Sequence, residues 1–214
     1  MKVMLVNGSP HNKGCTYTAL QEVGSVLAQE GIVTDVFWIG NKPIAGCLGC
    51  GMCAVKGRCR YDDVVNQFLD QAADYDGFLF GAPVHFASAA ASMMAFMTRA
   101  FFTDQFAGLH RFQFKPGAAI VSARRAGTTA ALEELNKFLQ YAQMPVVSSR
   151  YWNMVHGNTP AEVRRDEEGM QVMRVLGRNM AWLLKSLEVG RRAGVAEPKE
   201  EAERINTNFI TEEQ

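Results

Sequence analysis

Short apolar runs of strand length alternate along the chain with longer stretches in which apolar residues recur at helical spacing. Five runs have the length and the β-branched or aromatic composition of buried strands, and they comprise residues 2–6, 32–39, 77–81, 118–122 and 145–149. Helical spacing of apolar residues predicts helices over residues 16–30, 89–102, 128–143 and 160–192. A further helix is expected after Asp62 and Asp63, because carboxylates favour a helix N-terminus. A loop rich in glycine and cysteine, residues 40–60, precedes this helix.

Strands that alternate with helices are typical of βαβ units, in which helices cover both faces of a parallel sheet. The right-handed crossover rule then favours a doubly wound, five-stranded parallel sheet in a three-layer α/β/α sandwich. Residues 1–192 contain no repeat, low-complexity stretch or linker, so we expect one domain there. The tail, residues 193–214, is polar, and we expect it to pack on a partner subunit or to be mobile.

Composition narrows the classes of function. The 214 residues carry 22 basic and 22 acidic side chains, and this balance argues against a nucleic-acid groove or a basic membrane-binding patch. No apolar stretch approaches the roughly 18 residues that a membrane span needs, and no signal peptide is evident. The 5 cysteines are an odd number and four are bunched, unlike a secreted disulfide framework, so we expect a cytoplasmic protein with a small-molecule site.

Three loops of unusual composition each follow a predicted strand, and they comprise residues 8–16, 82–88 and 122–129. Because ligands of open parallel sheets bind beyond the carboxyl ends of the strands, we expect these loops to share one site. The first loop combines hydroxyls, backbone N–H groups and Lys13 before a helix, which is typical of an anion site. It matches neither the dinucleotide fingerprint nor the P-loop, which disfavours a nucleoside triphosphatase. A flexible turn capped by Thr16 is the alternative.

The second and third loops add an aromatic pair and two arginines. Pro83 fixes the backbone before His85 and Phe86, so that main-chain amides can face the heteroatoms of a flat ring. Taken singly, His85 is equally well an ordinary surface or core histidine. Arg124 and Arg125 are, taken singly, more simply explained as solvated side chains.

Taken together, the motifs Gly8-Ser9-Pro10, Lys13-Gly14-Cys15-Thr16, Gly81-Ala82-Pro83-Val84-His85-Phe86 and Arg125-Ala126-Gly127-Thr128 resemble those of the flavodoxin-like NAD(P)H-dependent FMN reductase superfamily. The resemblance implies a flavodoxin-like fold and an FMN phosphate site formed by Ser9, His11, Lys13, Cys15 and Thr16. It also implies that the isoalloxazine ring contacts Pro83, Val84, His85 and Phe86, and that Arg125, Gly127 and Thr128 approach the ring from the other side. Relatives often carry arginine in place of His11, asparagine or serine in place of Cys15, and tyrosine in place of His85. Cys15 still offers its backbone N–H group, and its side chain is better explained as a small residue at a tight turn than as a reactive thiol.

The four bunched cysteines, Cys47, Cys50, Cys53 and Cys59, have the spacing C-x2-C-x2-C-x5-C. Three thiolates on one glycine-rich loop suit a [4Fe-4S] cluster better than a single zinc ion, whose ligand pairs usually come from separated segments. The last gap and the absence of a following proline depart from the ferredoxin spacing. The motif resembles that of the iron–sulfur flavoprotein branch of the superfamily. Reduced thiols, a redox-labile pair and a zinc site all stay open as alternatives.

The resemblance implies an FMN-dependent oxidoreductase that passes electrons from NAD(P)H through bound FMN to a small acceptor, such as a quinone or a flavin. The flavin carries the chemistry, so we expect no acid–base pair, and His85 is the one candidate for a direct role. An iron–sulfur flavoprotein that carries electrons between protein partners is the alternative, and a zinc-stapled binding protein is a third. Members of the superfamily are commonly homodimers or homotetramers. The neutral charge balance favours a reductase for small diffusible substrates.

Overall fold

Parallel strands form the centre of this computed structural model, which describes residues 1–199. The parallel strands are β1 (Lys2–Asn7), β2 (Val33–Trp38), β3 (Gly77–His85), β5 (Gly117–Ala123) and β6 (Met154–His156), in the order β2-β1-β3-β5-β6. A two-residue strand, β4 (Ser88–Ala89), pairs antiparallel with the end of β3. The chain leaves β1 toward β2 on one side and returns to β3 on the other, so the sheet is doubly wound, as predicted.

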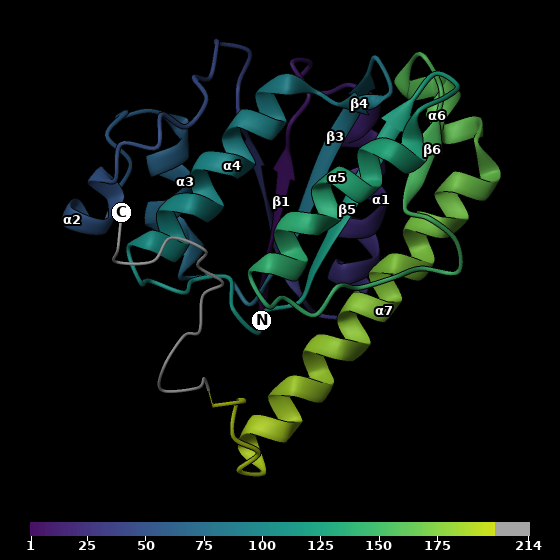
Figure 1. Ribbon diagram of the computed structural model, residues 1–214. Coiled ribbons are helices and arrows are strands. Elements are labelled where there is room, and N and C mark those ends of the chain that lie inside the picture. The colour runs from purple at the N-terminus through teal and green to yellow at the C-terminus, as the bar shows by residue number, and fades with distance from the viewer. Residues whose placement is uncertain (200–214) are drawn as a thin grey trace, which may run out of the picture.

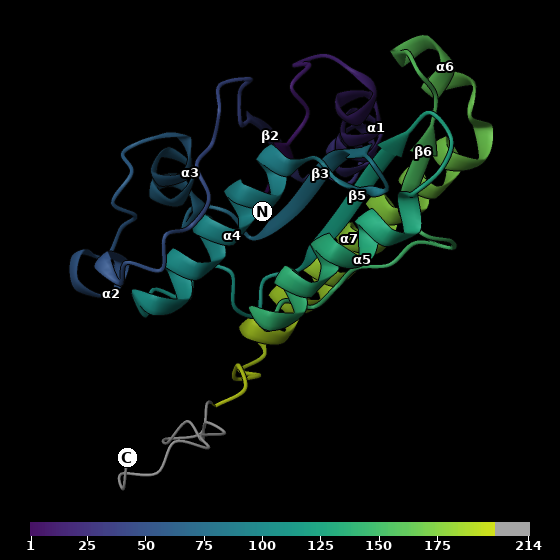
Figure 2. The ribbon, with the colours of Figure 1, turned by 45° about the horizontal axis from the view of Figure 1, so that its top comes forward.

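Helices cover both faces of the sheet, as Figures 1 and 2 show. One face is covered by α1 (Cys15–Gln29) and α7 (Glu167–Arg192), and the other by α3 (Val64–Ala72), α4 (Ala91–Phe106) and α5 (Thr128–Tyr141). Two short helices, α2 (Met52–Lys56) and α6 (Pro160–Arg165), lie in the connections. The three-layer sandwich is therefore confirmed. None of the helices in residues 1–199 is long and apolar enough to cross a membrane.

The sheet separates two buried apolar clusters, one under each helical layer. Along β1, Val3 and Leu5 belong to the cluster beneath α1 and α7, whereas Met4 and Val6 belong to the cluster beneath α3, α4 and α5. Successive side chains of a strand point to opposite faces, and all four are buried because both faces are covered. The result is a rigid scaffold that holds the loops at the carboxyl ends of the strands.

Two strand predictions need correction. β3 does not end at Gly81 but continues to His85, because Pro83 still pairs with Ser122 of β5 before the chain turns into β4. The segment 82–88 is therefore a strand end and a hairpin turn rather than a loop.

The fifth strand does not lie at residues 145–149. That segment makes only one bridge, from Val146 to Gly117, and β6 supplies the fifth parallel strand instead. Helix α7 also hydrogen-bonds to this segment, because the side-chain amide of Asn179 donates to Ser148 O at 2.8 Å. The run is thus held to the first residue of β5, because Gly117 N donates to Pro145 O at 3.0 Å and Val147 N donates to Gly117 O at 2.8 Å, and it is held to α7 at Ser148.

The last helix and the cysteine loop also differ from expectation. The predicted helix over residues 160–192 is divided at Asp166, whose carboxylate accepts a hydrogen bond from Gly169 N at 2.9 Å and begins α7 as its N-cap. Within the loop 40–60, α2 lies between Gly51 and Gly57, which both have positive φ. Of the tail, residues 200–214 lie outside the described residues, so its packing stays a prediction.

Candidate functional site

The loops that follow β1, β3 and β5 meet at the carboxyl-end edge of the sheet. Gly8 N donates to Gly81 O at 2.8 Å, which joins the first loop to β3. Gly127 lies so close to the β3–β4 turn that an added Cβ would be 2.6 Å from the Cα of Ala87. The sequence-based prediction that the three loops share one edge, next to the β1/β3 switch point, is therefore confirmed.

The loop between β1 and α1 is held by side chains on either side of it. Ser9 N donates to Asn7 Oδ1 at 3.1 Å, and Asn7 Nδ2 donates to Asn12 O at 2.9 Å. Ser9 Oγ accepts from His11 N at 3.1 Å, and Trp38 Nε1 donates to Ser9 O at 2.7 Å. Sequence reasoning missed the parts of Asn7 and Trp38, because both read as ordinary strand-end residues.

This loop leads into the N-terminus of α1, which has no side-chain cap. Gly14 occupies the N-cap position and makes no side-chain hydrogen bond, so the first helical N–H groups, beginning with Cys15, have no partner within the helix. His11 and Lys13 are exposed on the same loop, whereas Ser9 is buried beneath it. N–H groups, a lysine and the positive end of a helix together form a site suited to an anion such as a phosphate.

Two of the predicted phosphate ligands have side chains turned inward. Thr16 is fully buried, and its Oγ1 lies 2.8 Å from Ser122 Oγ, so its hydroxyl joins α1 to β5. Cys15 Sγ lies 3.6 Å from Gly157 O. Burial, and to a smaller degree the negative charge of Glu162, raises the pKa of the Cys15 thiol. Both residues can therefore offer a backbone N–H group to an anion, and Cys15 is not an activated nucleophile.

The β3–β4 turn is strained and exposed. Phe86 and Ala87 have φ values of 51° and 59°, a left-handed conformation that costs of order 1–3 kcal/mol for non-glycine residues. Phe86 is fully exposed. Glu134 of α5 holds the turn, because its Oε2 accepts from Ser88 Oγ at 2.8 Å and from Ala89 N at 2.9 Å. Nothing in the sequence distinguishes Glu134 from other acidic residues on a helix.

The other predicted site residues lie at the same edge with different exposure. Pro83 and Val84 are half-buried and Thr128 is buried, whereas His85 and Arg125 are exposed. Exposed aromatic and cationic side chains thus lie at the same edge of the sheet as the start of α1.

The four bunched cysteines lie elsewhere, in one pocket between α2 and the second half of α4. Figure 1 shows α2 beside α4 and away from the carboxyl-end edge. The pocket is lined by the cysteines together with residues of α4 that include Arg99, Phe102 and Thr103. α4 begins at Ala91, just after the β3–β4 turn, so a rise of 1.5 Å per residue separates this pocket from the turn by roughly 12–18 Å along the helix.

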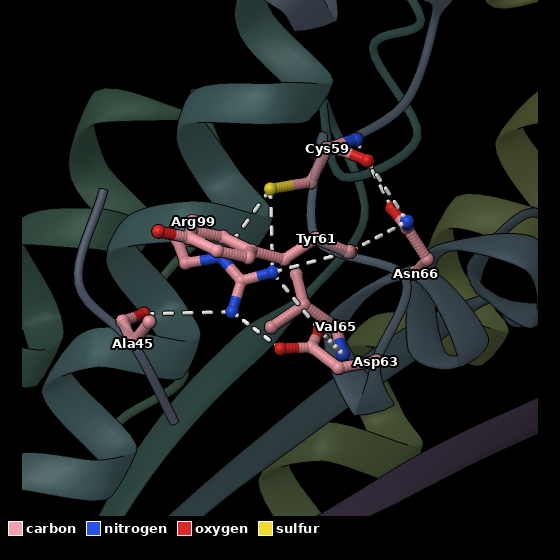
Figure 3. A network of polar contacts seen from close by, with 7 residues as sticks. All are labelled: Ala45, Cys59, Tyr61, Asp63, Val65, Asn66 and Arg99. Atoms are coloured by element: carbon pink, nitrogen blue, oxygen red, sulfur yellow. Dashed lines mark hydrogen bonds and ion pairs between the residues drawn. The ribbon is translucent and has the colours of Figure 1, made fainter. Parts of the chain in front are cut away.

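A buried arginine, Arg99, joins Cys59 of this pocket to Asp63 and Ala45, as Figure 3 shows. The guanidinium of Arg99 pairs with both carboxylate oxygens of Asp63, at 2.7 and 2.9 Å. Its Nε and Nη2 each lie 3.3 Å from Cys59 Sγ, and its charge lies 4.9 Å from the centre of the Tyr61 ring. Sequence reasoning placed Arg99 in an apolar helix and assigned it no part, because its partners lie 36–54 residues away.

The thiols of the pocket are free, and within residues 1–199 no three His, Cys, Asp or Glu side chains come together closely enough to hold a metal ion. Burial raises the pKa of the Cys53 thiol, and the nearby Cys47 and Cys50 raise it further. Gly49 N donates to Cys47 Sγ at 3.4 Å. The four sulfurs line one pocket without converging on a single point, and sulfur is a ligand of soft metals and iron–sulfur clusters rather than of hard cations.

Known proteins resemble this chain in sequence and in fold. The sequence model of the family described as NADPH-dependent FMN reductase matches residues 1–159. An iron–sulfur flavoprotein from Methanocaldococcus jannaschii is 28% identical over 194 residues, which are 88% of this chain and 100% of the relative. The solved structure of RosB with bound 8-demethyl-8-formylriboflavin-5'-phosphate has a TM-score of 0.70 at 13% identity and covers 99% of this chain and 94% of its own. A flavodoxin from the domain Archaea has a TM-score of 0.58 at 15% identity, with 86% and 99% covered. The flavodoxin-like fold is thereby confirmed.

Proposed function

The chain belongs to the NADPH-dependent FMN reductase family and is an oxidoreductase, and from this premise we propose that it transfers electrons from NADPH or NADH to a small acceptor such as a quinone or a free flavin. FMN, when bound, supplies the chemistry of hydride acceptance and electron donation. The observation that carries the proposal is the meeting of an anion site, a strained aromatic turn and an arginine loop at one switch point.

The first loop would bind the phosphate of the cofactor. The N–H groups at the start of α1 would donate to its oxygens, and the Ser9 hydroxyl, whose oxygen accepts from His11 N, would donate a further hydrogen bond. The exposed Lys13 adds positive charge at the rim, and the exposed His11 lies on the same loop. Asn7 and Trp38 keep this loop in shape without contacting the ligand.

The β3–β4 turn and the loop after β5 would hold the ring of the cofactor. The main-chain groups of Val84 and His85 lie at the carboxyl end of β3, next to the loop that would bind the phosphate. Phe86 covers this side with an exposed aromatic surface, and Arg125 approaches from the loop beside it. With the cofactor bound, these two side chains would shield the ring from water and orient the nicotinamide of the second substrate, and no acid–base pair is required because the flavin carries the chemistry.

A second candidate function is favoured by the cysteine pocket. Four cysteines line it beside Arg99, and a [4Fe-4S] cluster held by Cys47, Cys50, Cys53 and Cys59 would supply one-electron chemistry. The chain would then pass electrons to a protein partner rather than only to small molecules. The name of the relative from Methanocaldococcus jannaschii supports this candidate.

We also propose an assembly and a compartment. Trp182 and Val189 are exposed apolar residues of α7, whose C-terminal end extends beyond the sheet in Figure 1, and we propose that they contribute to a homodimer or homotetramer, which light scattering tests. Exposed free thiols at Cys47 and Cys50 are consistent with a reducing compartment such as the cytoplasm.

The decisive experiment is an anaerobic titration of protein reconstituted with FMN, iron and sulfide. NADPH or NADH should bleach the visible flavin absorbance, and a quinone should restore it over many cycles. Iron and sulfide analysis of the same sample separates the two candidates: flavin turnover without iron supports the reductase alone, whereas about four irons per chain support the cluster. A protein that retains no FMN contradicts both.

A further inference from the structure

Arg99 is the bulkiest of the fully buried side chains in the described part of the chain. A buried guanidinium costs several kcal/mol of desolvation unless its charge and its N–H groups are satisfied. Asp63 satisfies the charge through Nη1 and Nη2, and main-chain oxygens at Ala45 and Tyr61 lie 3.4 Å from the same nitrogens. All of these oxygen acceptors contact Nη1 or Nη2, so Nε can donate to a different group.

That other group is the sulfur of Cys59. Nε and Nη2 both lie 3.3 Å from Cys59 Sγ, so the edge of the guanidinium faces one sulfur with two donors, as Figure 3 shows. The backbone of Cys59 is fixed as well, because its N donates to Asn66 Oδ1 and its O accepts from Asn66 Nδ2, each at 3.0 Å. The pocket thus holds Cys59 rigidly at both the backbone and the sulfur, whereas Cys47 and Cys50 are exposed.

We infer that Arg99 is a positioning residue for an iron–sulfur cluster in this pocket: its two N–H groups hold the sulfur of Cys59 in place and raise the reduction potential of the cluster. This inference rests on the second candidate function, the cluster ligated by the four cysteines. Hydrogen bonds to cluster sulfurs and local net charge are among the factors that set such potentials. Reduction adds one negative charge to the cluster, so a buried cation and two sulfur-directed donors stabilise the reduced form.

Replacement of Asp63 should shift the reduction potential in the opposite direction from replacement of Arg99. Its carboxylate compensates the charge of Arg99 and, at the same time, caps α3 by accepting from Val65 N at 3.1 Å. Asn in place of Asp preserves an oxygen for the cap but removes the negative charge. Asp63→Asn therefore leaves the positive charge of Arg99 uncompensated and should raise the potential, whereas replacement of Arg99 should lower it.

The experiment is a redox titration of the reconstituted full-length protein under anaerobic conditions, followed by the electron paramagnetic resonance of the reduced cluster. Arg99→Met should shift the midpoint to more negative values by at least the 59 mV that corresponds to a tenfold change in the ratio of reduced to oxidised cluster. Arg99→Lys keeps the charge but loses the fork of donors, so we expect a smaller negative shift. Asp63→Asn should shift the midpoint in the positive direction.

Arg58→Met is the matched control. Arg58 lies on the same loop but pairs with Asp62 at the surface, where the two side chains are 50% and 87% exposed. We expect no shift of the cluster midpoint in this variant. The FMN content and the flavin midpoint serve as a second control, because Arg99 lies about 12 Å along α4 from the β3–β4 turn and should not affect either.

A purely structural role for Arg99 predicts a different pattern. Shifts of the same sign in Arg99→Met and Asp63→Asn, or an unchanged midpoint in Arg99→Met, would overturn the inference. If Arg99→Met does not fold or loses its cluster, Asp63→Asn decides: a positive shift supports the inference, and no shift or a negative shift overturns it. A wild-type protein that binds FMN but takes up no iron and sulfide overturns both the cluster and this inference, and leaves the flavin function standing.

Discussion

Ser9→Ala tests the phosphate site with the loss of one oxygen atom. Ser9 is buried beneath the first loop, and its Oγ accepts from His11 N at 3.1 Å. A hydrogen bond to a charged group contributes about 1.5–3 kcal/mol. Loss of the hydroxyl should therefore weaken FMN binding by roughly 10- to 150-fold, since about 1.4 kcal/mol corresponds to a tenfold change in Kd.

Thr16→Val is the matched comparison, because its hydroxyl faces the core instead of the ligand. Thr16 Oγ1 lies 2.8 Å from Ser122 Oγ, and both side chains are buried. Valine leaves the Ser122 hydroxyl without this partner, which should reduce the free energy of unfolding by about 1–3 kcal/mol. The backbone N–H group that faces the phosphate is unchanged, so FMN affinity should fall by no more than about threefold, or less than about 0.7 kcal/mol.

The assay is a titration of apoprotein with FMN, followed by quenching of flavin fluorescence, combined with urea unfolding of each apoprotein. Wild-type affinity in Ser9→Ala together with a large loss of affinity in Thr16→Val would refute the reasoning. That result would mean that the hydroxyl of Thr16, and not that of Ser9, contacts the phosphate.

Three further predictions concern the same edge of the sheet. Gly127→Ala should destabilise the protein by at least about 1 kcal/mol in urea, because Gly127 has a φ of 87° and the added methyl group would lie 2.6 Å from the backbone of the β3–β4 turn. Gly40→Ala, at a φ of 84° with nothing within 4 Å of the added Cβ, should cost less, and equal losses would contradict the proposed close packing. Burial raises the pKa of the Cys15 thiol, so the reactive thiolate is scarce at neutral pH. Mass spectrometry should therefore find that Cys15 is alkylated more slowly than the exposed Cys50, and that its alkylation accelerates only in alkaline solution. The free energy of unfolding should fall as the pH rises through this raised pKa. Glu134→Ala removes both hydrogen bonds that hold the turn, and hydrogen exchange there should rise while Glu134→Gln stays closer to wild type.

The sequence predicts the parts of the fold that local pattern determines. β1 and β5 are short apolar runs covered on both faces, and each lies within one residue of its predicted bounds at either end. The segment 145–149 is also a short run with two valines, but it pairs with β5 only at Gly117 and is then held by α7. Which of two short segments joins the edge of the sheet is decided by tertiary packing, which the periodicity of the sequence does not report.

The candidate site, like the fold, has a part that the sequence predicts and a part that it does not. Loops after strands of a parallel sheet must meet at one edge, so the grouping of the three loops follows from topology alone. The direction of the Thr16 side chain, the support of the turn by Glu134 and the contact of Arg99 with Cys59 join residues 40–106 positions apart. No spacing rule links such residues, and only the folded chain brings them together.

The central claim is that the carboxyl-end edge of the sheet binds FMN through its phosphate. The most direct measurement is a parallel titration of the wild-type apoprotein with FMN and with riboflavin, which has the same ring but no phosphate. We predict that FMN binds at least tenfold more tightly than riboflavin, and that raising the salt concentration reduces this difference because the site is cationic. Equal affinity for the two ligands, or binding of neither, would contradict it.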